Sequence, residues 1–480
     1  MIKIIYTALV AFKGCFSRTA AFHWFITAVT GIMLRVDDMG GVTSIIRSLG
    51  LKPIYEPINR FFRSDAWDLH GIEETWRRFV ANNAPLVKMN GYAVIIGDGI
   101  KVAKEAKRMP GVKRLHQESE NSSKPEHIYG IMYGGVGVLA GKGGQEYCVP
   151  LACEVQDGIG EIMKWSGERG KRRGSHVVEM INLAYRTSEA FGKSIALLDR
   201  YFLTVPALER LHELNLSDDN RVEAIIMAKA STVAYEKPPA RLPGTRGRTC
   251  VKGAPVKLAG MFTVDAERFK TAEVDMYGKK QTLRYHSADL LWGQKLYREM
   301  RFVLVNIEGR QVIISCTDTK MNPLDIIALY AKRFKIESTF KLLKHDVAAF
   351  AQRFWSRSMP KLNRFARKSE PDRLTKVKSK ESRDKIKKAF EASEGYVLCG
   401  IIALGILQLI SLLFCDGVKR KSLRYLRTPS RMTPSPATVA DYLRKTIYRG
   451  LVNEPNLEIS RIILGKMEAP DDRYFIKEAS

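Results

Sequence analysis

Three acidic side chains stand where metal-dependent chemistry could be assembled. Asp98 closes the short apolar run GYAVIIGD, and Asp199 closes a second apolar run, KSIALLD. Glu337 lies far downstream, inside an amphipathic segment. Carboxylates are hard oxygen ligands, so three of them gathered in space suit two Mg²⁺ ions about 4 Å apart. Such a pair of ions acts on phosphate esters, by in-line displacement at phosphorus.

The segment around Glu337 predicts a long helix that begins near Asn322-Pro323 and runs to about residue 350. Because each helical residue advances about 100°, one stripe roughly 80° wide carries Tyr330, Arg333, Glu337, Lys341 and Lys344. Arginine and lysine neutralise phosphates, and tyrosine donates a hydrogen bond or stacks. The stripe is therefore suited to hold a phosphate backbone beside one metal-binding carboxylate.

The elements that would position these acids follow a recognisable order. Short apolar runs predict strands at 91–99, 127–141, 146–158, 193–202 and 222–231, and periodic segments predict helices at 169–192 and 205–215. Strand, hairpin, helix, strand, helix, strand is the order of a ribonuclease-H-like core. In that arrangement the first and fourth strands are neighbours, so Asp98 and Asp199, predicted to end them, would meet.

We therefore predict an α/β chain with three parts. Residues 1–80 form a helical N-terminal domain, and 81–365 form the ribonuclease-H-like core. A mainly β insertion occupies about 232–321 of that core and contains Trp292. Residues 366–480 form a basic helical C-terminal domain.

The spacing Tyr330-x2-Arg333-x3-Glu337-x6-Lys344 resembles the YREK signature of bacterial insertion-sequence DDE transposases. It is similar to the group of these enzymes that carries a β-strand insertion between the second Asp and the Glu. The resemblance covers about residues 20–360, and beyond 360 only length and basicity agree.

The resemblance implies a cut-and-paste DNA transposase in which Asp98, Asp199 and Glu337 are the catalytic, metal-binding residues. It implies two Mg²⁺ ions, for which Mn²⁺ is expected to substitute. The implied partners are double-stranded DNA, at the inverted-repeat ends and the target, and a second copy of the chain in a homodimer. A hairpin intermediate is implied by the family alone. The family likewise implies that the domain 1–80 binds DNA ends and that the domain 366–480 serves DNA binding or dimerisation. The implied DNA-binding residues are Tyr330, Arg333, Lys341 and Lys344. Trp292 either stacks on an unpaired base or is a core residue.

Charge and composition agree with a polyanionic partner. The chain has 78 Lys and Arg against 51 Asp and Glu, a net charge of +27. Twelve basic residues lie in 361–388 and six in 419–431, and four more crowd positions 169–173. Seven Cys without a CxxC pair exclude a disulfide scaffold and disfavour a zinc site. A P-loop is excluded because Gly143 follows Gly141-Lys142, and because Thr187 holds the first glycine position before Gly192-Lys193-Ser194.

Three alternatives remain open at this point: another ribonuclease-H-like nuclease such as a resolvase, an inactive DNA-binding relic of a transposase, and a membrane-anchored basic protein. The last depends on the apolar run 396–415, which is long enough to span a bilayer. Gln408 and Ser411 inside this run favour a buried core helix, although a dimer contact is also open. We expect a cytoplasmic protein without a membrane span.

Overall fold

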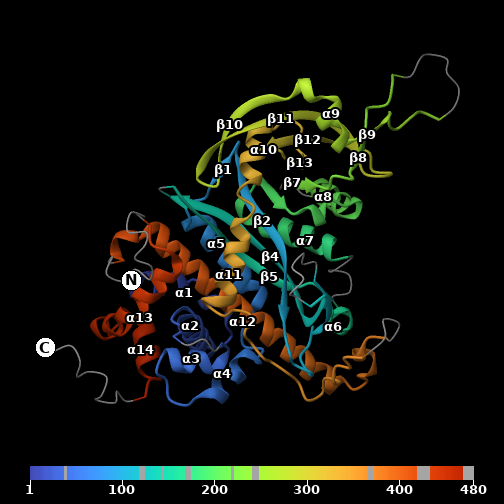
Figure 1. Cartoon of the computed structure of the whole chain (residues 1–480). Coiled ribbons are helices and arrows are strands. Elements are labelled where there is room, and N and C mark those ends of the chain that lie inside the picture. The colour runs from blue at the N-terminus through green and yellow to red at the C-terminus, as the bar shows by residue number, and fades with distance from the viewer. Residues whose placement is uncertain are drawn as a thin grey trace.

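The computed structural model describes residues 1–36, 40–117, 125–142, 144–167, 175–217, 221–240, 248–365, 371–418 and 433–468. The fold is mixed α/β, as predicted, with one large mixed sheet and helices on both of its faces (Figure 1). The basic residues at 169–173 and the basic run 419–431 lie outside the described residues.

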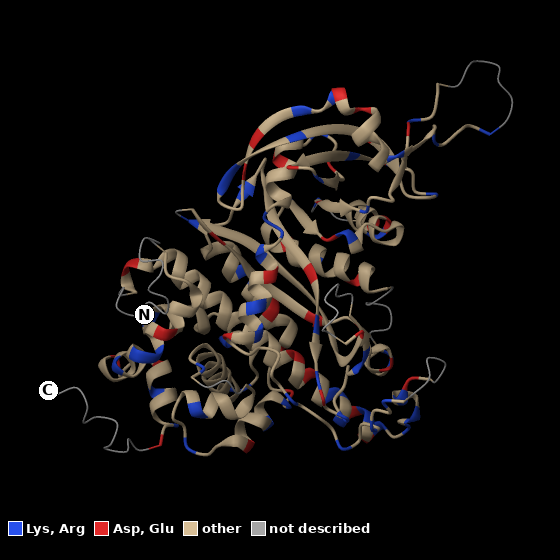
Figure 2. Ribbon diagram, viewed as in Figure 1, with Lys and Arg blue, Asp and Glu red and all other residues tan. Residues whose placement is uncertain are grey.

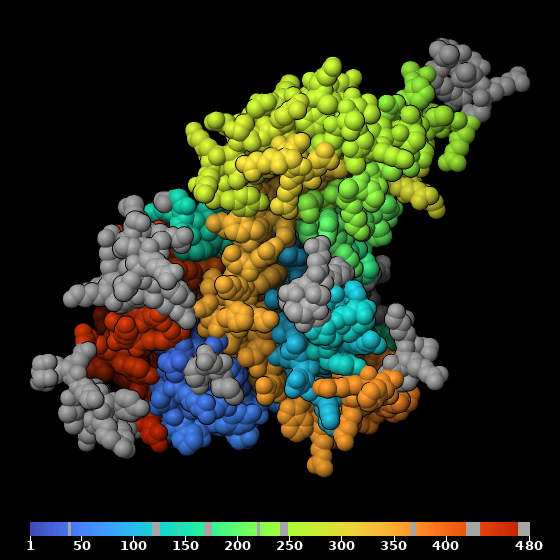
Figure 3. Space-filling view, viewed as in Figure 1, coloured from blue at the N-terminus to red at the C-terminus, as the bar shows by residue number. Residues whose placement is uncertain are grey.

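Helices from the two ends of the chain pack together. The first five are α1 (Ile2–Val10), α2 (Thr19–Met33), α3 (Val42–Ser48), α4 (Tyr55–Phe62) and α5 (Leu69–Asn83). The last three are α12 (Lys380–Leu413), α13 (Pro436–Asn453) and α14 (Glu458–Leu464). Helix α2 contacts α12 and α14, and α1 contacts α13. The N-terminal and C-terminal helices therefore lie side by side, blue beside red in Figure 3.

The sheet contains the five strands that the apolar runs predicted and two short strands, Lys88–Met89 and Lys113–His116, that they did not. Its first half contains β1 (Lys88–Met89), β2 (Tyr92–Ala103), β3 (Lys113–His116), β4 (His127–Lys142), β5 (Gln145–Val155), β6 (Ser194–Leu198) and β7 (Val222–Ala228). Strands β4 and β5 form the predicted antiparallel hairpin. Strand β2 pairs antiparallel with β4 and parallel with β6, and β6 pairs parallel with β7. The first and fourth predicted strands are thus neighbours.

The residues after β7 extend the same sheet. They form β8 (Val233–Tyr235), β9 (Pro255–Lys257), β10 (Lys270–Met276), β11 (Lys279–Trp292), β12 (Arg298–Ile307) and β13 (Arg310–Cys316), with the short helix α9 (Met261–Val264) between β9 and β10. Strand β13 pairs antiparallel with β7, and this joins the insertion to the first half of the sheet.

Short helices α6 (Gly160–Trp165), α7 (His176–Ser188) and α8 (Val205–Ser217) follow the hairpin and the fourth strand. The predicted helix 169–192 therefore begins later, at His176, within the described residues. Helices α10 (Pro323–Tyr330) and α11 (Lys335–His345) follow the insertion and cross the sheet in Figure 1.

The apolar run 396–415 is the inner part of α12, and the chain itself surrounds it. Among the described residues, α12 is the one helix long and apolar enough to cross a membrane, and 89% of its most apolar window is buried. A Cβ added at Gly395, Gly400 or Gly405 would lie 2.2–2.4 Å from Trp67, Ala349 or Trp76. Because five helical residues turn the direction by about 140°, these contacts cover three different faces of α12. The run is thus a core helix, as the sequence favoured.

Gly405→Ala should destabilise the fold by about 1–3 kcal/mol, because the new methyl group meets the Trp76 ring. That ring is fully buried, and its Nε1–H donates to the Pro150 carbonyl over 2.9 Å, so it cannot move aside freely. Urea unfolding measures the effect. Gly450→Ala on α13 is the matched control, since its Cβ would meet Ile2 at an ordinary 3.7 Å. The control should be neutral or stabilising by up to about 1 kcal/mol, and equal losses would contradict this packing account.

The segment 351–357 follows α11 without regular secondary structure, and a buried lysine holds its start. The Nζ of Lys104 donates to the carbonyls of Phe350 and Gln352, the latter over 2.7 Å. Burial lowers the pKa of Lys104 from 10.5 to about 7, and the charge of Arg353 adds to the effect. A cation buried this well ties the segment to the end of β2.

Lys104→Met should remove a pH dependence of stability. Because the pKa of Lys104 is about 7 in the folded chain and 10.5 when exposed, the unfolded chain binds the proton more tightly between these values. The contribution of this group to stability therefore rises with pH, by about 2 kcal/mol from pH 7 to 9. Urea unfolding at both pH values should show this rise in the wild type but a smaller one in the variant. Equal slopes would refute the assignment.

Candidate active site

Asp98, within β2, and Asp199, directly after β6, lie at the same level along two neighbouring parallel strands. The register pairs Ile96 with Leu197, and each acid lies two residues farther along its strand direction. Asp98 does not end its strand, however, which corrects the prediction. Strand β2 continues to Ala103 because its other edge pairs with the longer β4, where Asp98 stands opposite Gly135.

Different helices cover the two faces of the sheet at this point. A Cβ on Gly97 or Gly99 would meet Met180 or His176 of α7, within 3.1–3.4 Å. Successive strand residues face opposite sides, so Asp98 points to the other face. Helix α11 packs there, and a Cβ on Gly135 would lie 2.5 Å from the Phe340 ring. The glycine lets α11 approach Asp98 closely.

The segment that carries Glu337 is not one continuous helix, which corrects the prediction of a single helix from Asn322-Pro323 to about residue 350. Helix α10 ends at Tyr330 and α11 begins at Lys335. Between them the backbone stays right-handed but tightens, and N–H groups donate to carbonyls three residues earlier, as at Arg333 to Tyr330 and Glu337 to Phe334. Such tightened turns advance by about 120° per residue. A stripe calculated at 100° therefore does not extend unchanged from Tyr330 to Lys344.

Arg333 links two of the three acids. Its Nη1 lies 3.0 Å from Oδ2 of Asp98, and its Nη2 lies 2.6 Å from Oε1 of Glu337. The guanidinium side chain is only 15% exposed, so the pair with Asp98 is screened little by solvent. Asp98 also accepts the Gly99 N–H on Oδ1 over 2.7 Å.

The electrostatics show that Asp199 belongs to the same group. Burial raises the pKa of Asp98 above its ordinary value, and the charge of Asp199 adds to the rise. The Arg333 guanidinium and the Gly99 N–H oppose it. A buried carboxyl between a cation and a second carboxylate is typical of a functional site.

The hydroxyl of Tyr330 points into this site without a partner. It is buried, and it has no hydrogen-bond partner among the described residues. Burial raises the pKa of Tyr330, and the charges of Asp199 and Asp98 contribute to this rise. Buried hydroxyls in proteins are usually hydrogen-bonded. An oxygen of a bound ligand would supply the missing partner.

The structure thus brings together five of the eight residues that the sequence singled out. They are Asp98, Asp199, Tyr330, Arg333 and Glu337. Lys341 and Lys344 are exposed one and two turns farther along α11, and Lys341 borders a separate hollow of about 530 Å³ with residues 433–438. Trp292 ends β11, pairs with Arg298 and packs partly buried against the core.

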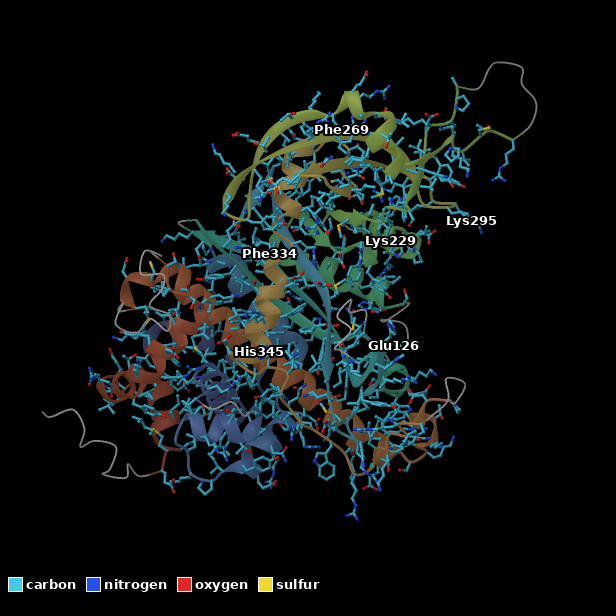
Figure 4. All side chains as sticks on the ribbon, viewed as in Figure 1. Glu126, Lys229, Phe269, Lys295, Phe334 and His345 are labelled. Atoms are coloured by element: carbon cyan, nitrogen blue, oxygen red, sulfur yellow. The ribbon has the colours of Figure 1, made fainter. Side chains whose placement is uncertain are left out.

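An aromatic pair beside the site was missed. Tyr277 lies at the turn between β10 and β11, is 62% exposed, and its ring lies 5.3 Å from that of Phe334. Phe334 precedes α11 directly, and Figure 4 labels it above His345, the other end of that helix. Tyr277 has a backbone φ of 55°, a value that residues other than glycine rarely adopt. The Tyr-Gly pair between two strand-like runs could have indicated this turn.

The three carboxylates have the donor chemistry that Mg²⁺ prefers. Within the described residues, no three Asp, Glu, His or Cys side chains converge closely enough to hold one ion, and the Arg333 guanidinium lies between Asp98 and Glu337. The exposed Glu337 side chain, at 59%, can turn away from Arg333. Comparison of the chain with protein-family models, with curated proteins and with solved structures gave no match in any of the three.

Proposed function

We propose that this chain is a DDE-type DNA transposase with a ribonuclease-H-like core, which cuts and rejoins DNA in cut-and-paste transposition. The observation that carries the proposal is that Asp98 and Asp199 lie at the same level along neighbouring parallel strands. Arg333 forms ion pairs with both Asp98 and Glu337, and so links the third acid to the first. The strand order β5-β4-β2-β6-β7 supports the same core, because it makes the first and fourth strands adjacent.

In this proposal Asp98, Asp199 and Glu337 hold two Mg²⁺ ions. When bound, these ions activate a water or a 3′-hydroxyl and stabilise the leaving oxygen at phosphorus. Arg333 has two N–H groups aimed at carboxylates, and one of them turns to a phosphate oxygen when Glu337 leaves it. The unpartnered Tyr330 hydroxyl donates to the same phosphate.

The partners are double-stranded DNA, at the inverted-repeat ends and the target, and a second copy of the chain. The charge of +27 supports a nucleic-acid partner. The burial of α12 inside the chain supports a protein that works in the cytoplasm without a membrane span.

The test uses the purified full chain and a duplex that contains the DNA flanking its reading frame. With Mg²⁺ we expect nicks at the 3′ ends of inverted repeats, followed by joining of those ends to a target plasmid, and no reaction in EDTA. Cleavage without joining would favour the nuclease or resolvase alternative. Duplex binding without any cleavage in Mg²⁺ or Mn²⁺ would refute the proposal in favour of an inactive relic.

A further inference from the structure

The segment 351–357 alternates between buried and exposed residues. Gln352, Phe354 and Ser356 are buried, with 1%, 3% and 6% exposure. The alternate residues are exposed: Arg353, Trp355 and Arg357. Burial thus alternates along the segment, and these three side chains share its exposed side. We call this set of three residues the RWR ridge.

The backbone of the RWR ridge is held by cationic side chains beneath it. Besides Lys104, Arg63 of the loop after α4 donates to the Trp355 carbonyl over 3.0 Å. Arg108 donates to the carbonyls of Arg357 and Met359 over 2.6 and 2.7 Å. These bonds, to the carbonyls of Gln352, Trp355 and Arg357, hold the backbone of the segment in place.

Trp355 is unusual for a tryptophan in a folded chain, because it is 56% exposed. The other five tryptophans are all buried or partly buried. Large exposed aromatic rings commonly mark a binding surface. The ring stands between two arginines, neither of which forms an ion pair within the part of the chain that the structure describes.

Two adjoining hollows, of about 670 and 440 Å³, lie beside the RWR ridge and share Arg63 and Lys388. Their cations are Arg18, Arg60, Arg63, Arg357, Lys385 and Lys388, against the acids Glu56 and Asp65. Figure 2 shows basic residues gathered on the lower part of the molecule, where the segment after α11 runs. This surface is shaped and charged for a polyanion.

We propose that the RWR ridge binds single-stranded DNA, with Trp355 stacked on an unpaired base and Arg353 and Arg357 on phosphates to either side. In a duplex the faces of the bases are stacked on one another, so an exposed indole ring cannot stack on them. A single strand offers both unstacked bases and phosphate charges. The inference rests on the proposed function only for the origin of the strand, which strand cleavage would supply.

The test measures binding of a fluorescent 20-nucleotide oligothymidylate by anisotropy in EDTA, so that cleavage plays no part. We expect Arg353→Ala/Arg357→Ala to weaken binding at least about tenfold and to reduce the slope of log affinity against log salt by about 1.4. Trp355→Ala should weaken binding about tenfold, and Trp355→Phe by less than about threefold. Quenching of tryptophan fluorescence by the oligonucleotide should disappear in Trp355→Phe.

The matched control is Lys257→Ala/Arg310→Ala, which removes two exposed cations from β9 and β13 of the insertion. It should change affinity by less than about threefold. Trp355→Ala should leave duplex affinity within about twofold. Unchanged oligothymidylate binding by Trp355→Ala, equal losses on duplex, or tenfold preference for single-stranded RNA would each overturn the inference. If the wild type bound oligothymidylate through the RWR ridge but cleaved no DNA, only the proposed function would be refuted.

Discussion

Asp98→Asn is expected to abolish the Mg²⁺-dependent cleavage of DNA, by at least about 10³-fold, while duplex binding stays within about twofold. The amide keeps the shape of the carboxylate, and its oxygen can still accept the Gly99 N–H, so the fold should persist. What is lost is the negative charge that a divalent ion needs. Asp199→Asn and Glu337→Gln should behave in the same way. Single-turnover cleavage of an end duplex measures all three.

Asp157→Asn is the matched control for this prediction. Asp157 is also followed by glycine, accepts that glycine's N–H over 2.7 Å, and pairs with a cation, Lys113, over 2.7 Å. It lies just beyond the end of β5, and its side chain is 45% exposed. This variant should cleave at the wild-type rate within about twofold. Cleavage by Asp98→Asn at the rate of the control would remove Asp98 from the catalytic site.

Arg333→Ala is expected to lower the rate of cleavage by about 10²-fold or more at neutral pH. The variant also removes the cation that opposes the rise in the pKa of Asp98. The pKa of Asp98 then rises further, so a larger fraction of this carboxyl is protonated at a given pH. Because the ionised form is the ligand, the pH at half-maximal cleavage should shift upward. A rate profile from pH 5.5 to 9 measures both changes.

Two variants separate this effect from a general loss of charge. Arg333→Lys keeps the charge but cannot bridge Asp98 and Glu337 with a planar fork. Its cleavage rate should therefore lie between that of the wild type and that of Arg333→Ala. Lys332→Ala removes the adjacent cation, which pairs instead with Glu146 over 2.6 Å. It should keep the wild-type pH profile. If Arg333→Ala also kept that profile, Arg333 would have no electrostatic role at Asp98.

Much of the framework could be predicted from the sequence because its signals are local. Apolar runs closed by an acid indicated β2 and β6, and the order of elements predicted that these strands are neighbours. The helical N-terminal region and the hairpin of β4 and β5 were predicted from periodicity and turn residues in the same way. The predicted end of the first strand was wrong because β4, a distant segment, pairs with β2 beyond Asp98.

The site itself depended more on contacts between distant segments. Helical spacing placed Arg333 beside Glu337, four residues later, but no periodicity indicates the second contact of Arg333, with the distant Asp98. The RWR ridge was also hidden, because its buried face includes Gln352 and Ser356, which look solvent-exposed in the sequence. Gln352 is buried only because the Tyr133 hydroxyl and Lys104 satisfy it.

By itself, the sequence determined the mixed α/β class and the neighbouring first and fourth predicted strands, because hydrophobic periodicity and turn residues act within a few positions. Only the tertiary structure decided that α12 is surrounded by its own chain, that Arg333 joins two acids, and that Trp355 stays in solvent. These outcomes depend on which distant side chain fills a gap or satisfies a buried polar group. That information lies in the packing of the whole chain.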